Sequence, residues 1–219
     1  RATRPSPASA GSMQLRVNAT DIEVDDEGRI SRACLQKLTA DASADVLLLV
    51  GTQVSVGEQP LARNDADAAE LLSAAAERCG DTRAMVNLAD LCRQGRAPGG
   101  AIKAAELVRR AADEGDPLGQ SSYARHLYEG IGVAQDKVEA VKYWEMAADQ
   151  GDATGLWQMA QTYHHDYDEV GRQRDGAKAL RLLRAAAAAG SHEAAAELRN
   201  VVDAEPFPGQ WPLTFYRRG

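Results

Sequence analysis

A short helix-ending signal returns four times along this chain at nearly constant spacing. At each position a glycine followed by aspartate or serine closes an alanine-rich stretch, and the glycines are 35, 36 and 39 residues apart. The four pairs are Gly80-Asp81, Gly115-Asp116, Gly151-Asp152 and Gly190-Ser191. Self-similarity at such a period is typical of repeat architectures, in which each unit buries its apolar face against its neighbours. The chain is therefore predicted to fold as an array.

Small side chains recur in register with these glycines. Alanines stand eleven and four residues before each glycine, and a small residue followed one turn later by a bulky one stands after it. The alanines are Ala69, Ala104, Ala140, Ala179, Ala76, Ala111, Ala147 and Ala186, and the later pairs are Ala84 with Leu88, Gly119 with Tyr123, Gly155 with Met159 and Ala194 with Leu198. Small side chains let two helices approach closely. Each unit is therefore predicted to be a helical hairpin.

The unit from Asp116 to Gly151 shows the pattern most clearly. Its first helix carries apolar and small residues on one face, and the glycines Gly130 and Gly132 allow the left-handed backbone of a tight reversal. Asp136 is expected to cap the second helix, as are Asp65 and Asp175 at the equivalent positions. In that second helix, the spacing of Tyr143-Trp144 among alanines favours core packing over a platform for stacking a ligand ring.

These residues resemble a known family. The segment 130–136, the pair Glu139-Ala140, Trp144 and the segment 147–151 are similar to the Sel1-like repeat, a relative of the tetratricopeptide repeat. The resemblance extends by register from Asp65 to about Val202. It implies a right-handed α-solenoid that acts as an adaptor or scaffold inside larger assemblies, without catalytic residues or cofactors. The loop at 95–99 and the insertion at 164–169 depart from the repeat.

The two ends of the chain differ in composition from the repeats. Residues 1–12 contain Arg1 and Arg4, and no acidic residue precedes Asp21, which fits either a transit peptide or a flexible leader. Residues 13–60 are predicted to form a small α/β cap with two strands, a short helix at 30–38 and a buried strand at 46–50. The solenoid is assigned to 61–202, so the fold class is mostly α.

Residues 203–219 are predicted to form an extended aromatic tail. Its prolines prevent regular hydrogen bonding, and its aromatic side chains can anchor it to the last repeat or to another protein, two alternatives that the sequence leaves open. These anchors are Phe207, Trp211, Phe215 and Tyr216.

Composition excludes several classes of function. The net charge is −7 with no basic stripe, so direct binding of nucleic acid is not expected. Cys34, Cys79 and Cys92 lack the paired spacing of a zinc site, and Cys79 and Cys92 are predicted to be buried, reduced thiols in a reducing compartment. No apolar run is long enough to span a bilayer.

The sequence offers little chemistry for catalysis or metal binding. His164 and His165 with Asp166, Asp168 and Glu169 have metal-ligand side chains, but adjacent residues on a helix point about 100° apart and no third ligand recurs at helical spacing. A solvated loop is favoured over a metal site. No nucleophile elbow, phosphate-binding loop or dinucleotide fingerprint is present. The chain is predicted not to be an enzyme.

A partner-binding groove is predicted on the first helices of the repeats. The stripe opposite the core residues contains the aromatic and arginine side chains that dominate interfaces, although a simple solvated groove is the alternative. The predicted groove residues are Val86, Asp90, Arg93, Ser121, Arg125, Tyr128, Trp157, Gln161 and His164.

The sequence therefore predicts a non-catalytic scaffold whose partners are other proteins. The favoured setting is an accessory subunit on the matrix side of a large mitochondrial assembly, peripheral to a membrane complex; a cytoplasmic location is the alternative. A respiratory complex is favoured over a mitochondrial ribosome because the chain is acidic. A free regulatory or quality-control adaptor is the second hypothesis, and an enzyme with its site in the N-terminal cap is the third.

Overall fold

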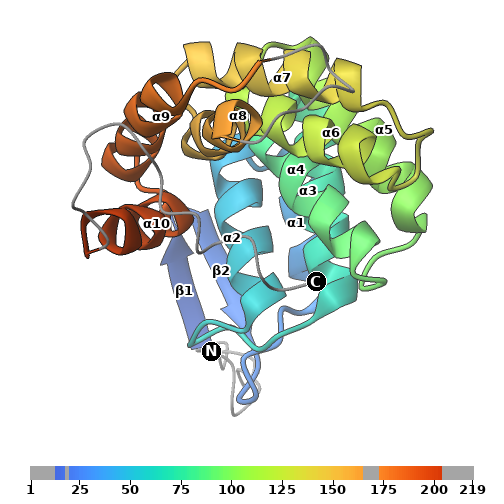
Figure 1. Ribbon diagram of the computed structural model, residues 1–219. Coiled ribbons are helices and arrows are strands. Elements are labelled where there is room, and N and C mark those ends of the chain that lie inside the picture. The colour runs from blue at the N-terminus through green and yellow to red at the C-terminus, as the bar shows by residue number, and fades with distance from the viewer. Residues whose placement is uncertain (1–12, 18–19, 165–172, 204–219) are drawn as a thin grey trace, which may run out of the picture. The chain divides into compact units, whose positions relative to one another are not determined.

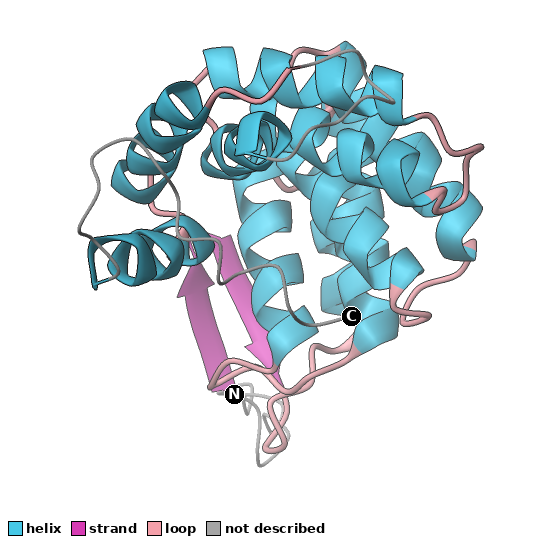
Figure 2. Ribbon diagram, viewed as in Figure 1, coloured by secondary structure: helices cyan, strands magenta, loops and turns pink. Residues whose placement is uncertain are grey.

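The computed structural model describes residues 13–17, 20–164 and 173–203. Within these ranges one pair of strands is followed by ten helices (Figures 1 and 2). The chain divides into two compact units, Arg1–Leu107 and Val108–Gly219, which are treated separately below. The predicted leader at 1–12, the tail anchors of 204–219 and most of the insertion at 164–169 lie outside the described residues.

The first unit begins with an antiparallel hairpin and continues with helices. In the hairpin Leu15 lies opposite Ile22, and Ile22 and Val24 are buried. The predicted short helix is present. The elements are β1 (Met13–Val17), β2 (Thr20–Val24), α1 (Arg32–Asp41), α2 (Ala44–Val56), α3 (Asp65–Cys79), α4 (Thr82–Arg93) and α5 (Gly100–Asp113), the last of which continues into the second unit.

The predicted strand at 46–50 is wrong, because these residues belong to helix α2. Val46, Leu47, Val50 and Val54 are all at most 3 % exposed, so α2 is buried over a broad face. A short continuous apolar run fits a buried strand and a buried helix equally well, and periodicity cannot separate them. Helix α2 packs along α3, and the two form a hairpin ahead of the recognised repeats. The predicted domain boundary at residue 60 falls in the loop that joins them.

The recurring glycine signal both ends one helix and starts the next. Gly80 takes a left-handed φ of 66° and closes α3, and the side chain of Asp81 then accepts a hydrogen bond from the Ala84 N–H. The same cap recurs at Asp116, Asp152 and Ser191. Such caps satisfy backbone donors that have no partner within the helix. One dipeptide thus fixes both helix boundaries of each turn.

The capping predictions for the second helices are confirmed at two positions and wrong at one. The carboxylates of Asp136 and Asp175 accept from the backbone of Glu139 and Lys178. In α3, however, Asn64 is the cap and Asp65 is the first helical residue. At the start of α3 the buried alanine is also one residue earlier than predicted: Ala68 is completely buried, whereas Ala69 is only half-buried.

The carboxylate of Asp65 instead accepts hydrogen bonds from two arginines. Arg96, in the loop between α4 and α5, donates to Asp65 Oδ1 at 2.6 and 3.0 Å and also to the Ser55 carbonyl oxygen at the end of α2. Arg63 donates to the same oxygen at 3.3 Å. These hydrogen bonds lower the pKa of Asp65 from 3.8 to about 2, and the bond from Arg96 has the largest effect. The loop at 95–99 therefore ties three elements of the first unit together.

We expect Asp65→Asn to weaken the first unit at neutral pH and to weaken it much less at low pH. Because folding lowers this pKa, the stabilisation is complete above pH 4 and is lost as the pH falls from about 4 towards 2. The side chain is 32 % exposed, so we expect a loss of about 1 kcal/mol at pH 7. Urea unfolding of both proteins at pH 7 and at pH 2.5 measures it. Asp26→Asn, at an exposed turn, is the control; a difference between native and Asp65→Asn that is the same at both pH values would contradict the assignment.

The second unit is a run of antiparallel helices. Its elements are α6 (Pro117–Glu129), α7 (Lys137–Asp149), α8 (Ala153–His164), α9 (Gly176–Ala188) and α10 (His192–Asp203). Each packs against the next, and the core of the α6–α8 part is built around Trp144, Leu127, Val141 and Met159. Ala140, Ala147, Ala179 and Ala186 are completely buried, as predicted from the register. Tyr143-Trp144 also belongs to this packing, since Trp144 is buried and Tyr143 packs edge-on against Tyr123.

Candidate functional site

The predicted groove residues of α6 are mostly occupied within the second unit. Ser121 is only 2 % exposed, and its hydroxyl donates to the Leu118 carbonyl oxygen at 3.2 Å. The Tyr128 ring lies 5.2 Å from the Trp144 ring and packs on the α6–α8 core. Arg125 is half-buried. From α6, therefore, Arg125 and one face of Tyr128 can contribute to a binding surface, and Ser121 cannot.

Two groove residues of α8 are held by a carboxylate that the sequence did not reveal. Gln161 Nε2 donates to both oxygens of Glu197 at 2.7 and 2.8 Å, and Trp157 Nε1 donates to Glu197 at 3.3 Å. Glu197 lies on α10, so this network joins alternate helices of the unit. Its one sequence signal is that a glutamate interrupts the alanine-rich stretch 194–198. Both Trp157 and Gln161 remain half-buried, with their orientation fixed from one side.

The remaining predicted groove residues divide between the surface and the core. His164 ends α8 and is half-buried, but its neighbours 165–169 lie outside the described residues, so the metal-cluster prediction stays untested. In the first unit Val86 is buried at 5 % exposure. Asp90 and Arg93 reach the surface of α4, where they pair with each other at 3.0 Å. Val86, like Ser121, is therefore a packing residue.

The three cysteines have different environments, and all are free thiols. Cys92 is buried, its Sγ donates to the Pro98 carbonyl oxygen at 3.2 Å, and burial raises its thiol pKa. Cys79 is exposed, so its predicted burial is wrong: it lies in the last turn of α3, where the helix leaves the packed layer. Nothing in the described part of the chain brings three His, Cys, Asp or Glu side chains together around a metal position.

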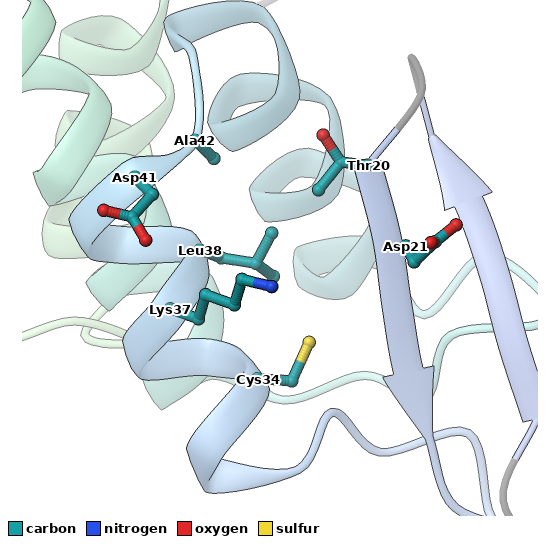
Figure 3. A pocket seen from close by; sticks show the side chains of 7 residues that line it. All are labelled: Thr20, Asp21, Cys34, Lys37, Leu38, Asp41 and Ala42. Carbon is teal, nitrogen blue, oxygen red and sulfur yellow. The ribbon is translucent and has the colours of Figure 1, made fainter.

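Cys34 lines a cavity of about 310 Å³ between α1 and β2 in the first unit (Figure 3). Its sulfur and the Lys37 amine point into the space between the helix and the strand, whereas Asp41 points away from it. The Glu23 N–H donates to Cys34 Sγ at 3.4 Å. The thiol therefore serves as a hydrogen-bond acceptor for the edge of β2.

The repeats themselves decide the family. The family model described as Sel1 repeat matches three consecutive segments, 82–116, 117–152 and 153–191, which together make up half of the chain. The chain belongs to the Sel1 repeat family. Each matched segment ends at Asp116, Asp152 or Ser191, the residue after the recurring glycine. The predicted family and the predicted helical solenoid are confirmed.

Two solved Sel1-type structures share the fold. A Sel1 repeat protein from Oxalobacter formigenes has a TM-score of 0.66 and 22 % identity, covering 81 % of this chain and 51 % of its own. The protein c5321, a protective antigen of uropathogenic Escherichia coli with the same kind of fold, has a TM-score of 0.63 and 26 % identity, covering 78 % and 36 %. The Sel1 chain described here thus spans about half or less of these proteins. No curated protein sequence matches it.

Membership of the Sel1 family indicates the general class of function. Sel1 repeats form protein–protein interaction scaffolds that are generally not catalytic, and repeat proteins of this kind bind other proteins. None of the described helices has the length and apolar character that crossing a bilayer requires.

Proposed function

We propose that this Sel1 repeat protein is a non-catalytic scaffold that binds a partner protein on the α6–α8 surface of its second unit. The observation that carries the proposal is the anchored position of Trp157, a half-buried indole whose N–H is bonded to Glu197. Tryptophan and arginine are among the residues most enriched in interface hot spots. Arg125 occupies the equivalent stripe of α6, one repeat before Trp157. The surface therefore has the residue types of a protein-binding site.

The Glu197 network also lowers the cost of binding. Immobilising a long side chain at an interface costs about 0.5–1.5 kcal/mol, and Trp157 and Gln161 are already held in place by hydrogen bonds at 2.7–3.3 Å. A partner segment that packs against the indole pays little of this ordering entropy. An extended segment or a helix with apolar side chains suits such a surface.

We expect Trp157→Ala to weaken partner binding about 30-fold and Arg125→Ala about tenfold, the usual range for central interface residues. Trp157→Phe, which keeps an aromatic ring but loses the bond to Glu197, should lose less than Trp157→Ala. Isothermal titration of each purified variant with the protein that co-purifies with the native chain measures these changes. Met146→Ala, at an apolar position of α7 that is 47 % exposed, is the matched control.

Circular dichroism and thermal unfolding of the same variants separate lost binding from lost folding. If Trp157→Ala and Arg125→Ala remain folded and bind the partner as tightly as the Met146→Ala control, the groove is a solvated surface and the proposed site is wrong.

For the setting of this scaffold, we propose an accessory subunit on the matrix side of a large mitochondrial assembly, with a respiratory complex preferred. The support is the arginine-containing, acid-free segment before Asp21 and the net charge of −7. Purification from the source in mild detergent should then recover the chain in a fixed ratio with membrane-bound subunits, stable to moderate salt. Recovery as a monomer with substoichiometric clients would instead support the free adaptor, and recovery from the cytoplasm would overturn the location.

A further inference from the structure

One edge of the hairpin β1–β2 is hydrogen-bonded to its own unit, and the other edge receives no hydrogen bond from the described residues. The Glu23 N–H donates to Cys34 Sγ, and its carbonyl oxygen accepts from the Ser31 N–H at 3.3 Å. Both groups therefore point away from β1, towards Ser31 and towards Cys34 in the first turn of α1 (Figure 3). In the described part of the chain no hydrogen bond reaches the outer edge of β1.

The register of the hairpin identifies which β1 groups point outwards. Glu23 lies opposite Gln14, and because Glu23 directs its N–H and C=O away from β1, this is a non-hydrogen-bonded pair. The two kinds of pair alternate in an antiparallel ladder. The backbone groups of Gln14 and Arg16 therefore project from the open edge, while those of Leu15 are used by β2. An open row of this kind is a template for another strand.

The apolar face of the hairpin is less buried on β1 than on β2. Ile22 and Val24 on β2 are at most 1 % exposed, but Leu15 and Val17, on the same face of β1, are only half-buried. On the opposite face Arg16 is 75 % exposed and lies 3.8 Å from Asp21. A strand added to β1 would cover Leu15 and Val17 and meet Gln14 and Arg16 with its polar face. A two-stranded sheet gains stability from such an addition.

We propose that the added strand is β1 of a second copy of this chain, paired antiparallel about a two-fold axis at Leu15. In this register Gln14 of one copy lies opposite Arg16 of the other, so the four projecting backbone groups of each copy find partners. All five residues of β1 are paired, and Leu15 meets Leu15 in the close, non-hydrogen-bonded position at the axis.

Neighbouring antiparallel registers fit less well. A shift that places Arg16 opposite Arg16 sets like charges against each other, which destabilises a cross-strand pair. A shift in the other direction places Gln14 opposite Gln14. Arg16 of each copy then lies opposite residue 12, which is not part of β1. Only the register centred on Leu15 keeps the two Arg16 side chains from lying directly opposite each other while pairing all five described residues of β1. The inference is independent of the proposed partner surface in the second unit.

The pairing should give a weak, concentration-dependent dimer, because five residues of strand bury less than a standard interface. Sedimentation equilibrium of the full chain over a range of concentrations should show a doubling of the molar mass. Arg16→Pro removes one projecting N–H without touching a bond to β2, and it should raise the dimer dissociation constant at least tenfold. Arg16→Gln, which keeps the backbone N–H donor, is the matched control.

Cysteine crosslinking tests the register itself. In a background with Cys34→Ser and Cys79→Ser, Leu15→Cys should form an intermolecular disulfide on mild oxidation, because the two Leu15 positions face each other at the axis. Arg16→Cys, which faces Gln14 instead, should crosslink far more slowly. A chain that stays monomeric at all concentrations overturns the proposal. The proposal is equally wrong if a monomeric chain is found to bind a strand of another protein through β1. A dimer that Arg16→Pro leaves intact overturns it as well.

Discussion

Trp144→Ala is expected to destabilise the second unit by about 3–5 kcal/mol, the usual cost of removing a buried tryptophan. Trp144 of α7 is 3 % exposed and packs against Tyr128 and Leu127 of α6 and Met159 of α8. Removing the indole leaves a cavity between α6, α7 and α8 that backbone packing prevents from closing. Equilibrium unfolding in urea, followed by far-ultraviolet circular dichroism, measures the loss.

A matched variant distinguishes the volume of Trp144 from its polarity. The indole N–H of Trp144 is buried and has no hydrogen-bond partner among the described residues, which costs free energy in the native protein. Trp144→Phe removes that N–H and only part of the volume, so it should cost about 1–2 kcal/mol, well below Trp144→Ala. Equal losses in both variants would contradict this account, because they would mean that the ring volume kept in Trp144→Phe contributes nothing to stability.

Gly155→Ala is the second substitution with a large expected effect, about 2–3 kcal/mol of lost stability, because α7 and α8 are in backbone contact there. A Cβ at Gly155 would lie 2.8 Å from the Ala147 Cβ, 2.8 Å from the Ala148 nitrogen and 3.0 Å from the Trp144 carbonyl oxygen. Alanine is favoured over glycine in a helix by at most about 1 kcal/mol, so the steric cost decides the sign. Gly119 is in the same position against Ala111 and Ala112.

The control for Gly155→Ala is Thr154→Ala, which introduces the same residue one position earlier at an exposed site of α8. This change should be neutral or stabilising by a few tenths of a kcal/mol, since alanine has the higher helix propensity. Thermal unfolding of the two variants side by side measures the difference. A Gly155→Ala protein as stable as Thr154→Ala would show that α7 and α8 can separate without cost.

The close approach at Gly155 also explains why the repeats are not identical. The same position holds alanine at residues 84 and 194, and Ala84 and Ala194 are completely buried. The position therefore always packs against a neighbouring helix, and the middle repeats bring the helices nearest. A small residue in fixed register was visible in the sequence, but the spacing that requires glycine was not.

The sequence by itself determined the repeat, its period and most helix boundaries. These features depend on local chemistry: a glycine with left-handed backbone ends each helix, and an aspartate or serine directly after it caps the next. Alanines at fixed distances from that glycine determined which face is buried. Such information lies within a few residues of chain, so it can be read without knowing the neighbours.

Only the tertiary structure decided the features that depend on contacts between distant segments. The run 46–50 became a helix because α3 covers it, and Val86 and Ser121 became packing residues because neighbouring helices close over them. Glu197 reaches Trp157 from 40 residues away, and Arg96 reaches Asp65 from 31. A long side chain has no periodic signal for its partner, because its hydrogen bond is set by how the helices stack and not by the residues beside it.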